Sequence, residues 1–269
     1  MRDALQPDPI LQSHLREAPW TSVATARLPG TGPVTPGDWL RVDEAYAPQI
    51  ALRERLIAAR HDQVHALMPQ ALKPAQELLS LVLAEVAARP DFQVNETSVI
   101  RPDGKTVQLN FDKPLLTLGV LVQQDFCILQ RMGDEHVLTG AILCFPASWT
   151  LAEKIARPLT TIHDSVPEYG NELARRVQRL FDAVRPERPL WRVNLLLYHD
   201  ATLHQPRLET DRRVKSPGQA RFVRSERQCI SRLPESDTIV FAIHTVVVRR
   251  SVLTREQLEG LSHYRSETT

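Results

Sequence analysis

Residues 119–145, GVLVQQDFCILQRMGDEHVLTGAILCF, carry the strongest strand signal in this 269-residue chain. Two apolar runs, residues 119–130 and 136–145, stand on either side of Gly133-Asp134. Short runs rich in Val, Ile, Leu and Phe that flank a glycine-containing turn are typical of an antiparallel hairpin. The stretch therefore predicts the first two strands of a largely buried sheet.

Downstream of this hairpin the pattern turns helical and then returns to strands. Helical pieces are predicted at residues 149–156 and 168–184, followed by strands at 190–199, 219–230 and 238–248. A last helix is predicted to begin at Thr254, which forms a capping box with Gln257. Two strands, a helical insert and three strands are the order of a PAS-type domain. We therefore expect an α+β fold, with a PAS-like antiparallel five-stranded sheet whose helical insert closes over one face.

Upstream, the chain predicts an N-terminal helical extension. Seven of the 20 prolines fall in the first 48 residues, which indicates an extended arm. Helices are predicted at residues 46–67 and 74–88, and a small hairpin at 92–100 and 106–111. We expect residues 1–90 to form the arm and helical extension and residues 91–269 the PAS-like domain; one continuous domain is the alternative.

Composition excludes several classes of protein. The chain has 33 Lys and Arg against 32 Asp and Glu, a net charge of +1, and 42% hydrophobic residues. This is too apolar for a disordered chain, and the balanced charge argues against nucleic-acid binding. No apolar run approaches the ~20 residues that span a bilayer, and the N-terminus lacks a signal peptide's apolar stretch. We expect a cytoplasmic protein that binds neither membrane nor nucleic acid.

Cysteine and glycine usage narrows the chemistry further. The three cysteines are far apart and set among apolar residues, which indicates buried thiols rather than disulfides. No CxxC pair, GxGxxG or GxxxxGK[ST] motif occurs among the 269 residues, so the usual zinc, iron–sulfur, dinucleotide and NTP signatures are missing. A redox enzyme with this sequence would receive its electrons from another protein.

Histidines offer one main candidate ligand. His61 and His65 have zinc-ligand spacing but lack the glutamate of HExxH, so we interpret them as helix-surface residues. His163 lies between Pro158 and Pro167, in a stiff loop of the helical insert. Such a loop suits an axial metal ligand, because it fixes the direction of the imidazole. A structural histidine bound to backbone carbonyls explains the pattern equally well.

The last group of candidates lies on the fourth predicted strand. By alternation, Arg224, Glu226 and Gln228 share one face of this strand. Ser225, Arg227 and Cys229 take the other face. Arginines beside a sheet face are suited to bind an anion such as a carboxylate or propionate.

Ordered short motifs across roughly residues 39–248 resemble the haem-containing alpha subunit of haem-dependent oxidative N-demethylases, which are dimethylamine monooxygenase-like. The motifs are Trp39 with Val42-Asp43-Glu44 and Tyr46, Gln124-Asp125, Cys144-Phe145-Pro146-Ala147-Ser148-Trp149, Glu153-Lys154-Ile155, Ile162-His163 with Val166-Pro167, Trp191-Arg192-Val193-Asn194, and Arg224-Ser225-Glu226-Arg227-Gln228 with Leu233-Pro234. The sequence departs from the family pattern at Ser165, Leu195, Cys229 and Val246.

This resemblance implies a haem b protein that oxidises a small secondary amine with O₂. It implies that NADPH, FMN and a 2Fe–2S centre belong to reductase partner subunits, and that formaldehyde passes to a tetrahydrofolate-linked subunit. His163 would be the iron ligand. A haem-PAS gas or redox sensor without turnover is the alternative, and a haem-free structural subunit is a third.

Within that hypothesis we assign further roles. Arg224, Arg227 and His244 are candidates for the polar group beside bound O₂, and the two arginines for binding the haem propionates. Glu226 is the candidate counter-charge for a protonated amine. Ile239, Phe241 and Ile243 are expected to pack against the porphyrin, with His244 on the alternate face.

Overall fold

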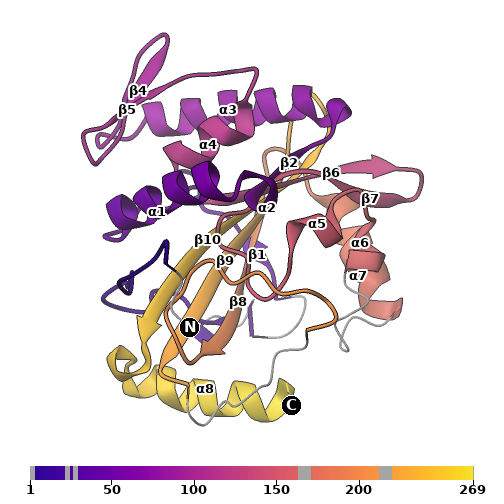
Figure 1. Ribbon diagram of the computed structural model, residues 1–269. Helices are drawn as coiled ribbons and strands as arrows, with labels where there is room; N and C mark the ends of the chain where they lie inside the picture. The colour runs from indigo at the N-terminus through magenta and orange to yellow at the C-terminus, as the bar shows by residue number, and fades with distance from the viewer. Residues whose placement is uncertain (1–3, 22–24, 27–29, 163–170, 212–219, 269) are drawn as a thin grey trace.

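The computed structural model describes residues 4–21, 25–26, 30–162, 171–211 and 220–268, and leaves the side chains of residues 171–174 and 262–268 undescribed. Its centre is a seven-stranded sheet with the order β1-β8-β9-β10-β6-β7-β2, in which all pairs are antiparallel. The strands are β1 (Gly32–Pro33), β2 (His65–Leu67), β6 (Asp125–Met132), β7 (Glu135–Ile142), β8 (Leu190–Tyr198), β9 (Phe222–Arg232) and β10 (Ile239–Arg249). Helices surround this sheet (Figure 1).

The five strands expected from the sequence are β6 to β10, and they are neighbours in the order β8-β9-β10-β6-β7. The helical insert lies between β7 and β8, as expected, and comprises α5 (Leu151–Lys154), α6 (Leu159–Ile162) and α7 (Asn171–Ala183). The expected number of strands was wrong, because the N-terminal region adds β1 and β2 at the two edges. These edge strands are two and three residues long, too short for a periodic pattern to reveal them.

Two predicted elements are confirmed only in part. Residues 119–130 do not form one strand, because α4 (Pro114–Leu121) ends inside that run before β6 begins. A continuous apolar run is compatible with a buried helix as well as a buried strand, and proline favours a first helical turn. The helix expected at 46–67 is divided into α1 (Tyr46–Ala59) and α2 (His61–Val64), and then continues as β2.

A second layer of helices lies at one end of the sheet. There α1 and α4 pack together with α3 (Leu72–Ala87), beside a three-stranded sheet of β3 (Gln93–Val94), β4 (Ser98–Ile100) and β5 (Thr106–Gln108) (Figure 1). The predicted small hairpin is confirmed as β4 and β5, but the run expected to form its first strand, 92–100, is divided into β3 and β4. In the connections that the structure describes lie the short 3₁₀ helices η1 (Pro19–Thr21), η2 (Pro69–Ala71) and η4 (Arg250–Val252).

Different segments cover the two faces of the large sheet. The insert face packs against α5, α6 and α7 through an apolar cluster that includes Leu151, Leu159, Phe181 and Ile243. The opposite face, which we call the arm face, packs against N-terminal residues and α8 (Arg255–Thr268) through a cluster that includes Leu15, Ala18, Val223, Val248 and Leu261. The capping box of α8 is confirmed: the Gln257 amide donates to Thr254 Oγ1 at 3.1 Å, and Gln257 Oε1 accepts from the Thr254 amide at 3.0 Å.

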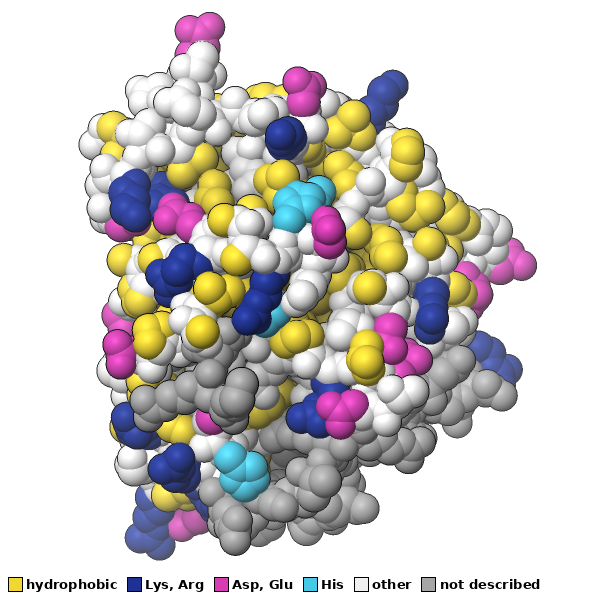
Figure 2. Space-filling view, in the orientation of Figure 1, with side chains coloured by type: hydrophobic (Ala, Val, Ile, Leu, Met, Phe, Trp, Pro, Cys, Tyr) yellow, Lys and Arg dark blue, Asp and Glu magenta, His cyan; other side chains and the backbone are white. Residues whose placement is uncertain are grey.

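The surface and the cysteines agree with the expectations from composition. In Figure 2 basic and acidic side chains are scattered over the face that is drawn, without a patch of one sign. All three cysteines are buried free thiols. Among the described residues, no helix has both the length and the apolar character needed to cross a bilayer.

A buried polar band on the insert face as candidate functional site

The insert face carries a group of polar side chains across three neighbouring strands. Glu226 of β9 is paired with Asn194 of β8 and Thr245 of β10. Gln228, two residues further along β9, is paired with Arg192 and Ile243. Because side chains alternate along a strand, these residues and Arg224 point to the same face. We call Arg192, Asn194, Arg224, Glu226, Gln228 and Thr245 the polar band.

The carboxylate of Glu226 is the centre of this band. Its Oε1 accepts from Arg224 Nε at 3.0 Å, and its Oε2 accepts from Asn194 Nδ2 at 3.3 Å and from Gln228 Nε2 at 3.2 Å. The residue is 5% exposed. A carboxylate offers about four acceptor positions, so the three hydrogen bonds from described residues leave roughly one for a ligand.

Arg224 holds Glu226 in place and is itself held by the backbone. Its Nη1 donates to the carbonyl of Leu203 at 2.8 Å, and its Nη2 donates to the carbonyl of Phe145. With Nε bound to Glu226, every nitrogen of the guanidinium contacts a protein acceptor. The geometry makes Arg224 a rigid support for the carboxylate.

The segment that binds Arg224 is fixed by a second buried charge pair. Asp125, at the start of β6, accepts from the amides of Cys144 and Phe145 at 2.7 and 2.8 Å. Arg53 of α1 pairs with Asp125 at 2.7 Å, and both side chains are fully buried. The pair therefore connects helix α1 to Phe145, whose carbonyl accepts from Arg224. Because the pair is buried, it holds this segment rigidly.

The hydroxyl of Thr245 is an unsatisfied polar group of the band. Thr245 is 1% exposed, and its Oγ1 has no hydrogen-bond partner among the residues that the structure describes. Buried hydroxyls in folded proteins are nearly always hydrogen-bonded to protein or water. The hydroxyl lies on the same face as the carboxylate of Glu226, so the band offers a ligand both groups.

Apolar side chains lie beside the polar band on the insert face. Ile239, Phe241 and Ile243, the residues expected to pack against a porphyrin, lie on the insert face in one cluster with Leu190. The insert contributes Trp149, Ile155 and Ile162 to this cluster as half-buried residues. An apolar wall around a few convergent polar groups is the usual construction of a small-molecule site.

His163, the candidate iron ligand, lies outside the described residues. The last described residue before it is Ile162, whose carbonyl accepts from Lys154 Nζ at 2.6 Å. Lys154 is 3% exposed and also contacts the carboxylate of Glu209. Within the part of the chain that the structure describes, no three His, Cys, Asp or Glu side chains are grouped to hold a metal ion.

Arg227 and His244 lie on the arm face, where they hold the N-terminal arm. Arg227 Nη2 donates to Asp38 Oδ2 at 3.1 Å, and His244 Nε2 lies 3.0 Å from Asp43 Oδ2. Burial raises the pKa of Asp43, but the hydrogen bond and charge of His244 and the hydrogen bonds of Gln123 and Gln12 outweigh it and hold the pKa at about 2. The structure thus brings Arg224 and Glu226 together and separates them from Arg227 and His244.

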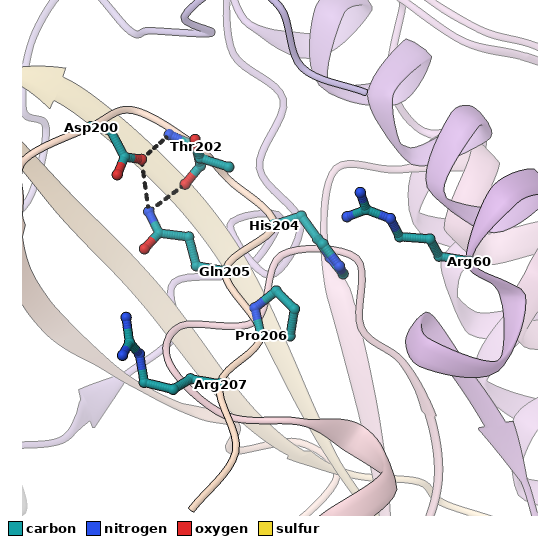
Figure 3. A pocket seen from close by; sticks show the side chains of 7 residues that line it. All are labelled: Arg60, Asp200, Thr202, His204, Gln205, Pro206 and Arg207. Carbon is teal, nitrogen blue, oxygen red and sulfur yellow. Dashed lines mark hydrogen bonds between the residues drawn. The ribbon is translucent and has the colours of Figure 1, made fainter. Parts of the chain in front are cut away.

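A shallow pocket lies beside the backbone segment that binds Arg224. It encloses about 280 Å³ and is lined by Arg60, Asp200, Thr202, His204, Gln205, Pro206 and Arg207. Figure 3 shows the side chains of His204 and Arg60 pointing toward each other. His204 Nδ1 lies 2.9 Å from the carbonyl of Cys144, so this pocket borders the support of the polar band rather than the band itself.

His61 and His65, interpreted as helix-surface residues, form a pair at the end of α2. Their ring centroids are 4.9 Å apart. Burial, with a smaller contribution from His61, lowers the pKa of His65 to about 4. The helix-surface interpretation is confirmed for His61, the first residue of α2, and is wrong for His65, which is the first residue of β2.

A buried carboxylate and an unsatisfied hydroxyl, beside the apolar cluster of the helical insert, are features typical of a protein that binds a small polar ligand against a sheet face. The sequence profile of the haem-dependent oxidative N-demethylase, alpha subunit-like family matches residues 30–263. The chain belongs to this family. The family is haem-dependent, and its name implies that members work with other subunits. No curated protein matches the sequence.

Proposed function

We propose that this chain is the haem-bearing subunit of an enzyme that oxidatively N-demethylates a small secondary amine, using O₂ and electrons from partner subunits. The observation that carries the proposal is the buried Glu226 carboxylate, which three side chains hold on the insert face with room for one more donor. A protonated amine is the donor that such a group binds best.

The fold supports a PAS-like assignment. The five central strands have the order β8-β9-β10-β6-β7, and the helical insert between β7 and β8 covers one face. Fold alone does not decide between an enzyme and a haem-PAS sensor. The polar band favours the enzyme, because a gas ligand carries no charge for Glu226 to balance.

The residue types on the insert face support the placement of a haem there. Phe241, Ile243 and Leu190 offer an apolar wall, and the unsatisfied hydroxyl of Thr245 lies beside it. His163 would hold the iron of haem b, with Lys154 fixing the carbonyl of the preceding residue. The haem would supply the activation of O₂.

This chain's own residues would bind and orient the amine. Glu226 would pair with the ammonium group, Asn194 and Gln228 would fix the carboxylate's plane, and Arg224 would position it through its two carbonyl contacts. The insert would exclude water, which strengthens the ion pair.

The roles proposed for Arg227 and His244, at bound O₂ or at the propionates, compete with this arrangement. A haem on one face of the sheet can touch only one of the two sets. Both residues are engaged by arm carboxylates, which supports a haem on the insert face, with Arg224 and Glu226.

Electron supply is assigned to partners. The sequence holds no glycine-rich dinucleotide motif and no CxxC pair, which supports NADPH, FMN and the 2Fe–2S centre on reductase subunits and a tetrahydrofolate-linked subunit for formaldehyde. We place the complex in the cytoplasm.

The test begins with absorption spectra of the purified chain, ferric and dithionite-reduced. The wild-type protein should show a Soret band, and the position or intensity of this band should change in His163→Ala. Glu226→Gln should keep the band but lose the spectral response to dimethylammonium, because the amide cannot balance the ammonium charge. NADPH consumption and formaldehyde release with partner subunits should follow the same pattern. A normal Soret band in His163→Ala would refute the iron ligand, and a haem protein without formaldehyde release would favour the sensor.

A further inference from the structure

The buried Thr245 hydroxyl is expected to lower the stability of the fold, and nothing in the described residues compensates for it. It is buried, it points to the insert face, and it finds no partner among the described residues. A buried hydroxyl without a hydrogen bond lowers stability, and valine would fill the same volume without that cost. Retained unsatisfied polar groups are expected where function requires them.

Its position relative to Glu226 suggests what the hydroxyl does. The two residues are directly paired across β9 and β10, and paired residues on one face have Cβ atoms about 4.5–5.5 Å apart. An ammonium group that contacts the carboxylate therefore lies within reach of the hydroxyl, since both contacts need only about 2.7–3.2 Å. The hydroxyl oxygen has two lone pairs to accept with.

We propose that Thr245 is a specificity-determining residue, which accepts the second N–H of a protonated secondary amine whose first N–H binds Glu226. This inference rests on the proposed function and adds a residue to it. A secondary ammonium ion has two N–H groups and satisfies both acceptors. A tertiary ammonium ion has one and leaves the hydroxyl unsatisfied, and a quaternary ion has none.

The test compares two ions on the haem-loaded chain by calorimetry, dimethylammonium and trimethylammonium. A hydrogen bond to a charged group is worth enough that its loss weakens binding about tenfold or more. Thr245→Val should therefore bind dimethylammonium about tenfold more weakly and trimethylammonium within about twofold of wild type. Thr245→Ser, which keeps the hydroxyl, should restore most of the preference. An unchanged ratio of affinities in Thr245→Val would overturn the inference.

Thermal unfolding without amine gives an independent readout. Thr245→Val should unfold at the wild-type temperature or above it, because no hydrogen bond is lost. Thr117→Val is the matched control: Thr117 is 5% exposed and its Oγ1 donates to the carbonyls of Asn110 and Lys113, both at 3.1 Å. This control should unfold at a lower temperature, with unchanged amine binding. An equal drop in Thr245→Val would reveal an internal partner and overturn the inference.

The two proposals fail differently. If Glu226→Gln no longer binds either ammonium ion while Thr245→Val keeps the wild-type ratio of the two affinities, the proposed function stands and the role of Thr245 is refuted. If wild type binds neither ion, the amine site itself is wrong and both proposals fall.

Discussion

The charged side chains on the two faces of strand β9 differ in how far their partners are buried. On the insert face, Arg224 and Glu226 are 1% and 5% exposed, and the arginine contacts two backbone carbonyls of neighbouring segments. On the arm face, Arg227 is equally buried, but its partners Asp38 and Glu17 have side chains that are 32% and 20% exposed. One face encloses its charge pair, and the other uses charge to fasten a peripheral segment.

The difference distinguishes a candidate binding site on the insert face from structural ion pairs on the arm face. Arm-face charges are paired across segments, so each pair holds residues of the N-terminal arm against the sheet. The insert-face carboxylate is supported by its own strand and its neighbour, and the described residues leave part of its acceptor capacity unused. Preorganised groups with unmet capacity are what a binding site requires.

The largest expected effect comes from removing each arginine in turn. Arg224→Met would leave Glu226 buried without its cation and two carbonyls without a donor, which should lower the free energy of unfolding by ~3–5 kcal/mol. Arg227→Met should cost ~1–2 kcal/mol, because its carboxylate partners can reach water. Urea unfolding of both variants measures the difference. Equal losses would show that the two faces do not differ in this respect.

A smaller effect concerns the pH dependence of the arm. The pKa of Asp43 is held at about 2, below its ordinary 3.8. Since the folded pKa is the lower one, this stabilisation is present above pH ~4 and is lost as pH falls toward 2. It amounts to ~2 kcal/mol. Asp43→Asn should reduce the slope of unfolding free energy against pH in that range.

The exposed Asp134 in the hairpin between β6 and β7 offers the control for this experiment. Asp134→Asn should leave the slope unchanged. A wild-type slope in Asp43→Asn would mean that other carboxylates dominate acid unfolding, and the arm face would then not depend on the contact between Asp43 and His244.

Local pattern predicted much of this arrangement. Alternation along one strand was enough to place Arg224, Glu226 and Gln228 on one face and Arg227 on the other, because strand geometry fixes the period at two. The order of β6 to β10 around the insert followed from runs of apolar residues and turns. These features depend on neighbours in sequence, which a single chain displays.

Features that depend on distant partners escaped prediction. The strands β1 and β2 exist because sheet edges offer unpaired backbone groups, and nothing in their own few residues requires a strand. That Arg224 supports Glu226 follows from the carbonyls of Phe145 and Leu203, far along the chain. Whether the hydroxyl of Thr245 finds a hydrogen-bond partner depends on its surroundings in the fold, so no sequence motif predicts it.

The smallest expected effect compares a buried thiol on each face. Burial raises the pKa of Cys127 to about 12, with Asp125 adding to it. Burial also raises the pKa of Cys229 to about 11, although Arg227 and Arg41 oppose it. Both thiols should therefore resist iodoacetamide at pH 8 in the native protein, since the thiolate is the reactive form.

Low concentrations of urea should then distinguish the faces. Cys229 contacts Arg227, which carboxylates of the N-terminal arm hold, and it also packs in the core cluster with residues of α1, α3 and α4. Detachment of the arm should therefore loosen one part of its cover, whereas Cys127 lies in the cluster covered by the insert. Local opening of small peripheral segments costs less free energy than opening of the core. Cys229 should be labelled several-fold faster than Cys127 in pulse alkylation read by mass spectrometry, and Asp43→Asn should widen the gap by loosening the arm. Equal labelling rates would show that the arm opens only with the whole sheet, and the arm face would then be as much a part of the core as the insert face.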